Sequence, residues 1–361
     1  MTAIKVVTIL GTRPEIIRLS RVIPLLDQAG SHVLVHTGQN FEPLLSDVFF
    51  HELGVRAPDH RLACRGRTAM EQVASILVES ERVLVAERPD RVLVLGDTNS
   101  ALAAVVAKRM GIPVYHMEAG NRCYDDRVPE EVNRRIVDHC SDVLMPYTQR
   151  SRANLVREGI AADRIRVTGN PIREVLAFHA GQIDASDVMT RLGLTPGGYL
   201  LATLHRAENV DVPERLAGFV EAFRRLHAAH AVPVVWSVHP RTRSILDERR
   251  IELGEGIVAT EPLGLFDFVH LERRALCVLT DSGTVQEECC IDMVPSVILR
   301  DVTERPETLD VGSTVLSGAD PEAILAAVHG ALATPPAWTP VPEYMALDVS
   351  SVAAAIVSGP R

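Results

Sequence analysis

The sequence predicts an α/β protein made of two Rossmann-like, doubly wound domains that face each other across a cleft. Short β-branched runs alternate with longer helical patterns from end to end, which is typical of parallel sheets covered by helices. A chain of 361 residues is too long for one hydrophobic core and suits two α/β domains. Gly169, Asn170 and Pro171 interrupt the alternation, so we place the domain boundary there.

The first domain is expected over residues 1–170. Its strands are predicted at Lys5–Leu10, His32–His36, Arg91–Leu95, Pro113–Met117, Val143–Met145 and Ile165–Thr168. Helices are predicted to begin near Pro14, Phe41, Thr68, Asn99, Glu130 and Thr148. The helices fall between the strands, as a doubly wound sheet requires.

The second domain is expected over residues 171–345 and repeats the alternation. Its strands are predicted at Tyr199–Thr203, Val232–Ser237, Ile257–Ala259, Leu276–Thr280, Ser296–Leu299 and Thr314–Val315. A helix start is clear where Asp211 can cap and Pro213 falls in the first turn. A final helical run, Met345–Val357, follows a proline-rich stretch, and we expect residues 346–361 to pack back on the first domain.

Bulk composition excludes several classes of function. Hydrophobic residues make up 47% and charged residues 23%, as in globular proteins, and the formal net charge of -10 argues against a nucleic acid or an anionic membrane as the main partner. The first apolar run is too short for a signal peptide, and no run reaches membrane-spanning length, so we expect a cytoplasmic protein. The six cysteines lack metal-ligand spacing, so we expect no metal.

Charged side chains gather in the segment from His116 to His139, where a predicted strand ends. Glu118 follows that strand, and Asp97 follows the strand before it, so both reach the carboxyl edge of the sheet, where open α/β sheets bind ligands. Glu130 and Arg134 lie in the first turns of the next helix. The apolar stripe of that helix is assigned to Val132, Ile136 and Val137. Taken alone, such a tract is more often a charged loop before a solvated helix.

The turn after the first strand is a candidate anion site. Gly11 permits a tight turn and Pro14 sets the start of a helix, which leaves Arg13 beside backbone amides. A plain turn with a solvated arginine explains these residues equally well. The turn lacks the G-x-G-x-x-G pattern, so a dinucleotide has no support and we expect no cofactor.

A second strand-to-helix turn contains Ser282, Gly283 and Thr284, whose amides and helix dipole would attract phosphate. Glu288 lies about one turn further on, where it can accept hydrogen bonds from paired sugar hydroxyls. By itself, the turn is more often a simple helix cap. His205 ends the first strand of the second domain. The conjunction of two anion sites, a histidine and several carboxylates indicates one catalytic site.

The chain resembles the non-hydrolysing UDP-N-acetylglucosamine 2-epimerase family, which has the glycosyltransferase-B type of fold. The ordered blocks that carry the resemblance are GTRPE, GDTNS, HMEAGNR, VPEEVNRRIVDH, VTGNP, LHRAENV, HPRTR, DSGTVQEE and TERPE, and they run through nearly the whole chain. The variant blocks GTRPEIIRLSR, TGQN, MEAGNRC and DSGT look more like the branch that epimerises modified UDP-sugars, including deoxy and uronic derivatives. The resemblance also implies a homodimer.

The resemblance implies a UDP-sugar substrate that is held by its UDP moiety. Phe268 would help to place the uracil, and Glu288 would bind the ribose. Arg13 and the amides of residues 282–284 would hold the diphosphate. The implied substrate-binding set also includes Arg18, Arg134, Leu263 and Arg305.

The implied reaction is anti elimination of UDP to a 2-acetamidoglucal, then re-addition of UDP after C2 is protonated on the other face. Such an inversion needs a base on one face and an acid on the other. Asp97, Glu118 and Glu130 are the candidate proton-transfer carboxylates, without assignment to a face, and His205 would assist near the diphosphate or the sugar hydroxyls. We expect burial or crowding beside a second carboxylate to raise the pKa of one of them.

Three departures from the family pattern concern the substrate and its regulation. Arg18 stands where the best-known members have Lys, and Thr284 stands where they have a second Gly. Residues 37–40 lack the Gln-His pair of an activating second UDP-sugar site, so we do not expect that regulation.

Alternatives are a hydrolysing epimerase that releases UDP and N-acetylmannosamine, a glycosyltransferase, and a non-catalytic UDP-sugar binding protein. The three carboxylates favour proton abstraction over glycosyl transfer.

Overall fold

The chain divides into two compact units. We analysed a computed structural model, which describes residues 4–39 and 43–360 without the side chains of residues 43–46. Unit 1 comprises Met1–Phe178 and Pro342–Arg361, and unit 2 comprises His179–Val341. The predicted helix start near Phe41 lies outside the described residues.

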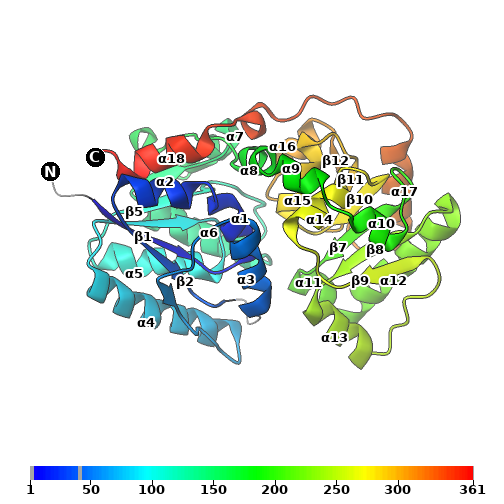
Figure 1. Cartoon of the computed structure of the whole chain (residues 1–361), viewed down its shortest axis with the longest axis horizontal. Coiled ribbons are helices and arrows are strands. Elements are labelled where there is room, and N and C mark those ends of the chain that lie inside the picture. Colours follow the sequence, from blue (N-terminus) through cyan, green and yellow to red (C-terminus); the bar gives the residue numbers. More distant parts are fainter. Residues whose placement is uncertain (1–3, 40–42, 361) are drawn as a thin grey trace. The chain divides into compact units, whose positions relative to one another are not determined.

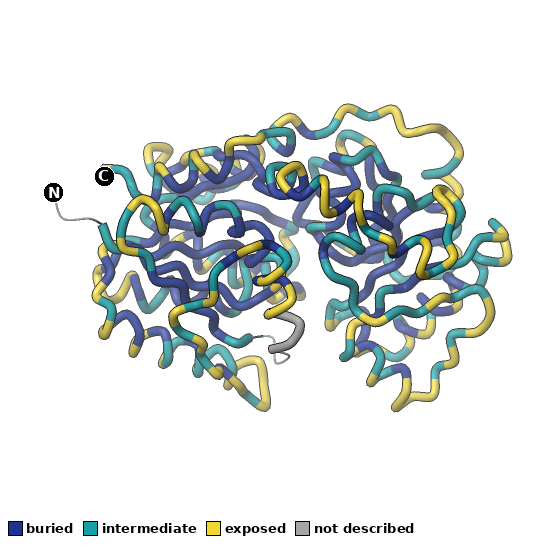
Figure 2. The backbone as a smooth tube through the Cα atoms, in the orientation of Figure 1, coloured by how far each residue is buried: buried dark blue, intermediate teal, exposed yellow. Residues whose placement is uncertain are grey.

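Unit 1 is built on a parallel sheet of six strands. Its strands are β1 (Lys5–Leu10), β2 (Ser31–His36), β3 (His60–Arg61), β4 (Arg91–Leu95), β5 (Val114–Met117) and β6 (Val143–Met145). They lie in the order β3-β2-β1-β4-β5-β6, which is the Rossmann order. The central strands are buried along most of their length (Figure 2), which accounts for their continuous apolar runs.

Helices cover both faces of this sheet (Figure 1). They are α1 (Arg13–Leu19), α2 (Val22–Ala29), α3 (Pro43–Glu52), α4 (Ala69–Glu87), α5 (Ala103–Arg109), α6 (Pro129–Cys140), α7 (Gln149–Arg157), α8 (Ile172–Phe178) and α18 (Val349–Ser358), with short 3₁₀ helices η1 (Asn99–Leu102), η2 (Ala162–Arg164) and η3 (Pro342–Met345). Residues of α4, α5 and α6 join the strands in one apolar core. On the other face, the C-terminal helix α18 packs on α2.

Unit 2 repeats the same topology with a second six-stranded parallel sheet. Its strands are β7 (Leu200–Leu204), β8 (Val234–Val238), β9 (Ile257–Thr260), β10 (Cys277–Thr280), β11 (Ser296–Ile298) and β12 (Thr314–Leu316). The order β12-β11-β10-β7-β8-β9 is the Rossmann order traced from the opposite edge. The predicted fold class, with two Rossmann-like domains, is therefore confirmed.

Successive residues of the central strands in unit 2 supply two different cores. Its helices are α9 (Ala180–Asp184), α10 (Val188–Leu192), α11 (Ala207–Val210), α12 (Pro213–His230), α13 (Pro240–Glu248), α14 (Leu265–Glu272), α15 (Gly283–Ile291), α16 (Pro306–Asp310) and α17 (Pro321–Leu332). On β7, Leu200 and Ala202 pack with α12 and α17, whereas Leu201 packs with α14 and α15. Strands buried on both faces cannot show an alternating pattern, which is why they appear as apolar runs.

One predicted strand is wrong. Ile165–Thr168 forms a single bridge, from Ile165 to Leu144 of β6, and is not a strand. The chain leaves the sheet at Gly169, whose φ of 86° belongs to the left-handed region, so pairing cannot continue. The sixth strand is instead β3, which has only two residues and no alternation that could reveal it.

The predicted apolar stripe of α6 is also wrong. Val132 and Ile136 are 38% and 42% exposed, and only Val137 is buried. The buried face of the helix consists mainly of Glu131, Arg134 and Asp138. The opposite face of the helix therefore exposes the aliphatic side chains of Val132 and Ile136.

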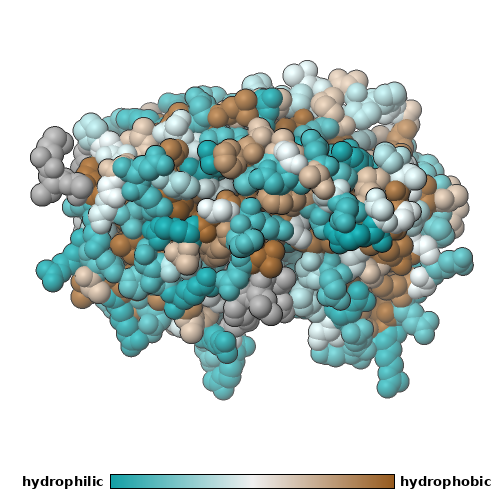
Figure 3. Space-filling model, viewed as in Figure 1, coloured by the Kyte–Doolittle hydropathy of each residue, from teal (hydrophilic) through white to brown (hydrophobic). Residues whose placement is uncertain are grey.

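The surface drawn in Figure 3 is mainly hydrophilic, and hydrophobic residues show between the polar ones in small groups. Within residues 4–39 and 43–360, we find no helix with the length and hydrophobicity needed to cross a lipid bilayer.

Candidate active site

In each sheet the predicted motifs flank the point at which the strand order reverses. In unit 1 that point lies between β1 and β4, which lead into residues 11–13 and 96–99. In unit 2 it lies between β7 and β10, which lead into residues 205–206 and 281–284. Open parallel sheets bind ligands at such switch points. Each unit therefore has one candidate site at the carboxyl edge of its sheet.

Glu118 lies at the centre of a charged network in unit 1. Arg18 donates a hydrogen bond to its Oε2, and Arg134 donates one to its Oε1 at 3.0 Å. Arg134 also donates to Asp97, so one guanidinium joins the two carboxylates. The side chains of Arg18, Arg134 and Glu118 are almost fully buried. The structure thus brings together four residues that the sequence selected from three separate motifs.

The charges of this network are paired. We expected burial or crowding beside a second carboxylate to raise the pKa of one of the proton-transfer groups, and this stays a prediction. In the structure an arginine contacts each oxygen of Glu118. Neighbouring positive charge favours the ionised carboxylate. Such a group can accept a proton as soon as a substrate presents one. Arg18 is predicted to contact substrate; in the structure it contacts Glu118 and lies 5.7 Å from the centre of the Tyr147 ring.

The backbone at Glu118 is unusual, because its φ of 63° places a non-glycine residue in the left-handed region. Its amide donates to the carbonyl of Met145 at 3.1 Å, which anchors the bend to β6. Below it, His116 Nε2 lies 2.8 Å from the Gly96 carbonyl and its Nδ1 lies 2.9 Å from Asp138. Strained conformations of this kind persist only where surrounding contacts enforce them, and they are common at functional sites.

Helix α6 is tied to the turn that contains Asp97. Asn133 donates to the Asp97 carbonyl at 3.0 Å and to the Asn99 side chain at 3.1 Å. Glu130 lies in the first turn of α6, one turn before Arg134, and is half-buried. Its convergence with the carboxylates at the strand ends stays a prediction.

Two buried acids that the sequence did not single out support these turns. Glu15 accepts hydrogen bonds from the amides of Gly11 and Thr12 at 3.0 and 2.8 Å, and it contacts the Thr98 hydroxyl at 3.2 Å. It therefore connects the turns after β1 and β4. Burial raises the pKa of Glu15 to about 7, although its hydrogen bonds lower it. In the sequence, a Glu three residues after a Thr indicates only a capping box. The contact of Glu15 with Thr98 could not be predicted from that pattern.

Asp138 is the second of these acids. Its Oδ2 accepts from Arg122 at 2.7 Å and from the Gly120 amide at 3.2 Å. Burial alone would raise the pKa of Asp138, but the hydrogen bonds and charges of His116 and Arg122 hold it below its usual value. This group fixes the loop that follows Glu118.

Arg13 has a different environment from the other predicted cations of unit 1. It is the first residue of α1 and is exposed. Its guanidinium lies 5.4 Å from the centre of the Phe49 ring. Arg13 is therefore an exposed cation at the N-terminus of α1, whereas Arg18 is buried.

In unit 2, His205 is held by Asp281. The two backbone amides of His205 and Arg206 donate to the Asp281 carboxylate at 3.0 to 3.2 Å, and His205 Nδ1 lies 3.0 Å from it. Asn209 donates to the same carboxylate at 3.1 Å. Burial would raise the pKa of Asp281, but His205 and the hydrogen bonds lower it far below its usual value. Asp281 therefore stays ionised and orients the half-exposed imidazole.

The predicted phosphate turn begins α15. Ser282 is the N-cap residue and Gly283 and Thr284 form the first turn. A Cβ atom built on Gly283 would lie 3.2 Å from the Arg305 guanidinium, so the arginine packs directly against this turn. Arg305 donates to Glu287 at 2.7 Å, which fixes its position. A helix dipole, backbone amides and a guanidinium thus meet at one point, as binding of an anion requires.

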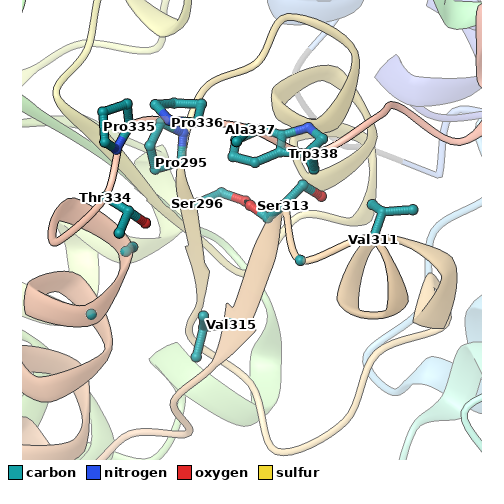
Figure 4. Close-up of a pocket in the computed structure, with 13 residues that line it drawn as sticks. Pro295, Ser296, Val311, Ser313, Val315, Thr334, Pro335, Pro336, Ala337 and Trp338 are labelled. Carbon is teal, nitrogen blue, oxygen red and sulfur yellow. The ribbon is translucent and has the colours of Figure 1, made fainter.

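The remaining predicted residues lie nearby in unit 2. Leu263 precedes α14 and Phe268 lies on it, and both pack partly buried against the core that contains α15. Glu288 is buried on α15. A separate cavity of about 370 Å³ lies beside β11 and β12, with Ser313 and Trp338 in its wall (Figure 4). Among the described residues that line this cavity, none belongs to the predicted site.

A family model described as UDP-N-acetylglucosamine 2-epimerase matches residues 26–349. The chain belongs to this family. The resemblance seen in the sequence is therefore confirmed, and the chain is an enzyme of the isomerase class, because this is a family of epimerases.

Curated relatives of this epimerase family align along most of the chain. The UDP-N-acetylglucosamine 2-epimerase of Methanocaldococcus jannaschii is 40% identical over 334 residues, which cover 90% of this chain and 91% of the relative. A UDP-2,3-diacetamido-2,3-dideoxy-D-glucuronate 2-epimerase of Pseudomonas aeruginosa is 38% identical, with coverage of 91% and 92%. Both the unmodified and the modified branch are thus among the similar proteins.

Solved structures of epimerases in this family share the fold. The M. jannaschii UDP-GlcNAc 2-epimerase in complex with UDP-GlcNAc and UDP has a TM-score of 0.92 and is 38% identical, with 98% of this chain and 99% of that chain covered. The Rickettsia bellii UDP-N-acetylglucosamine 2-epimerase has a TM-score of 0.91 at 37% identity, with 98% and 96% covered. The glycosyltransferase-B type of fold expected from the resemblance is confirmed.

Proposed function

We propose that this enzyme is a non-hydrolysing UDP-sugar 2-epimerase that interconverts UDP-N-acetylglucosamine and UDP-N-acetylmannosamine. A base removes the C2 proton, the C1–O bond breaks, and UDP leaves with the electron pair to give a 2-acetamidoglucal. C2 is then protonated on the other face as UDP adds back to C1. The observation that carries the proposal is the network of Asp97, Arg134, Glu118 and Arg18 at the switch point of unit 1.

We assign the proton transfers to Asp97, Glu118 and Glu130. The two arginines on Glu118 support an ionised carboxylate, as removal of a C2 proton requires. An ionised carboxylate in a dry, charge-compensated site can act as a base without being protonated in the resting enzyme. Exchange of the C2 proton with solvent deuterium, measured for each epimer separately, tests which carboxylate acts on which face. If D97N, E118Q or E130Q loses this exchange with only one epimer, the substituted carboxylate acts on the C2 face of that epimer.

We assign UDP binding to unit 2. The N-terminus of α15 at residues 282–284, with Arg305 behind it, would bind the diphosphate. Phe268 and Leu263 would bind the uracil, and Glu288 would bind the ribose. His205, oriented by Asp281, would stabilise the departing diphosphate. Exposed Arg13 of unit 1 is the further cation assigned to the diphosphate.

The sugar itself has a second candidate. The P. aeruginosa relative is named for a diacetamido-dideoxy-glucuronate, at 38% identity, so a modified UDP-HexNAc is the alternative substrate. Thr284 in the phosphate turn and Arg18 beside Glu118 are the residues of this chain that favour the modified branch.

Proton NMR in heavy water tests the proposal. The purified enzyme is incubated with UDP-N-acetylglucosamine, and in parallel with its 6-deoxy and uronic analogues. We expect both C2 epimers to form and deuterium to enter C2. Epimers without solvent-derived deuterium would exclude the elimination mechanism, and steady release of UDP would instead indicate a hydrolysing epimerase.

We propose that the enzyme is a cytoplasmic homodimer. Support for dimerisation comes from the aliphatic side chains that α4 and α6 direct outward, with Val78 and Val85 at 49% and 59% exposed and Val132 and Ile136 at 38% and 42%. Light scattering after size exclusion should give twice the chain mass, and the V132E/I136E variant should give the mass of one chain. Cell fractionation tests the location.

A further inference from the structure

Glu304 is a buried carboxylate in the segment that joins β11 to α16 of unit 2. Its two oxygens accept hydrogen bonds from Nη1 and Nη2 of Arg300 at 2.8 and 2.9 Å, which makes a bidentate pair. Two further guanidiniums approach the same carboxylate. Nη1 of Arg206 and Nη1 of Arg305 each lie 3.8 Å from one of its oxygens. One acid therefore lies among three arginines that come from different parts of unit 2.

The three arginines keep Glu304 ionised. Burial alone would raise its pKa, but the charges of Arg206, Arg300 and Arg305 hold that pKa well below its usual value. The side chains of Glu304 and Arg300 are 0% and 2% exposed, so solvent screens their charges little. Without the carboxylate, three cations would face one another in this interior and repel. The negative charge of Glu304 thus allows the guanidiniums to lie close together.

Two of these arginines border the phosphate turn at residues 282–284. The backbone amide of Arg206 donates to the side chain of Asp281 at 3.0 Å, and its Nε donates to the Asp281 carbonyl at 3.1 Å. Asp281 directly precedes the turn. Arg305 packs against Gly283 within the turn, where an added Cβ would lie 3.2 Å from the guanidinium. The central carboxylate therefore joins two cations that lie next to the N-terminus of α15.

Arg305 is held by carboxylates from two different segments. Its Nε donates to Glu287 of α15 at 2.7 Å, and its Nη1 faces Glu304. A guanidinium with two such contacts keeps one orientation before a ligand arrives. Cations that are already in place can stabilise an anion without further reorganisation.

We propose that Glu304 is a positioning residue for diphosphate binding, which holds the guanidiniums of Arg206 and Arg305 beside the phosphate turn. This inference rests on the proposed function, in which the turn at residues 282–284 binds the diphosphate of a UDP-sugar. Glu304 acts through its arginines, because both of its oxygens already accept from Arg300. Its task therefore concerns the phosphates and not the base or the ribose.

Binding of UDP and of uridine to the full chain tests the proposal, because uridine has the base and the ribose but no phosphate. In E304Q a neutral amide faces the arginines, and its N–H groups cannot accept from them. We expect the Kd of UDP to rise by about tenfold, as when a hydrogen bond to a charged group is lost, and the Kd of uridine to stay the same. Calorimetry measures UDP, and ligand-observed NMR measures the weaker uridine.

E322Q is the matched control. It also removes a glutamate–arginine ion pair from unit 2, that of Glu322 with Arg225 at 2.6 Å, but this pair lies at the surface. Both dissociation constants should equal those of the unmodified enzyme.

Two outcomes would overturn the inference alone. E304Q could bind UDP as tightly as the unmodified enzyme, or it could lose affinity for UDP and uridine to the same extent, which would show that Glu304 only maintains the fold of unit 2. If E304Q does not fold, E304D decides, because it keeps the charge but shortens the side chain. Weaker binding of UDP alone would support the proposal, and unchanged binding of UDP would contradict it. Failure of the unmodified enzyme to bind UDP would refute the proposed function itself, and this inference with it.

Discussion

At the scale of single residues, the candidate site depends on how one arginine compensates two acids. Arg134 is fully buried and contacts both Asp97 and Glu118. Loss of a buried cation leaves two carboxylates close together and uncompensated, so one of them will take up a proton. The sequence identified all three residues, but it did not show that they contact one another.

Substitution of Arg134 should therefore change both rate and pH dependence. We expect R134M to lower kcat for epimerisation by about a hundredfold or more and to move the optimum to higher pH, because a charge contact at the reacting centre is lost. R134K keeps the positive charge but loses the planar guanidinium that can contact two carboxylates at once. Its kcat should therefore lie between those of R134M and the unmodified enzyme. Initial rates over a pH series, with thermal unfolding of each variant, provide the measurement. A kcat of R134M equal to that of the unmodified enzyme would contradict the role of the network.

Glu15 gives a prediction about stability. Its pKa is raised from 4.5 to about 7, so the folded state binds this proton more tightly than the unfolded state. The contribution of Glu15 to the free energy of unfolding should therefore be largest below pH 4.5, fall as the pH rises to about 7, and change no further above it. The fall is of the order of 3 kcal/mol, from about 1.4 kcal/mol per pKa unit.

E15Q should remove this dependence, because the Gln oxygen can accept from the Gly11 and Thr12 amides while its amide donates to Thr98. Urea unfolding of both proteins across the acidic and neutral range provides the comparison. The same slope in E15Q as in the unmodified protein would assign the dependence to other groups.

At the scale of elements, strands were easier to predict than the faces of helices. Eleven of the twelve predicted strands begin within two residues of an observed one, and most run along buried apolar segments, but the buried face of α6 is not the face that we predicted. Its pattern of Val132, Ile136 and Val137 is amphipathic by the usual rule, yet the buried face is charged. Charged side chains can be buried only if each finds a partner, and partners such as Glu118 come from distant segments that local periodicity does not contain.

The start of α15 gives a prediction at this scale. G283A should raise KM for the UDP-sugar several-fold with a smaller effect on kcat, because the new Cβ would lie 3.2 Å from Arg305 at the phosphate turn. G330A, within α17, is the matched control, since a Cβ there meets no atom within 4 Å. It should leave KM unchanged and add slightly to stability. Steady-state kinetics of both variants decide; equal KM values would show that the turn does not bind the diphosphate.

At the scale of the whole molecule, the C-terminal helix α18 belongs to unit 1. Ser350 of α18 donates its amide to Glu174 at 2.8 Å, and Arg91 of β4 donates to the Val357 carbonyl at 2.5 Å. The helix also packs on α2. The last part of the sequence therefore stabilises the first.

Truncation after Leu347 should thus destabilise unit 1 and abolish epimerisation while UDP still binds to unit 2. The reason is that α18 buries Val349, Ala353 and Val357 and belongs to the core of unit 1. Hydrogen exchange should show loss of protection in β1 and β4 but not in β7 and β10, and calorimetry should still detect UDP. Loss of protection in both units would mean that they fold as one cooperative body.

The sequence by itself determined the α/β class, the strand-to-helix turns and the family, because apolar runs, glycines and caps are local signals. It also named the charged residues at the ends of the strands. Only the tertiary structure decided which of them meet: Arg134 with Asp97 and Glu118, and Asp281 with His205. Burial and pairing depend on contacts between residues far apart in the chain, and those contacts are what give a charged residue its role.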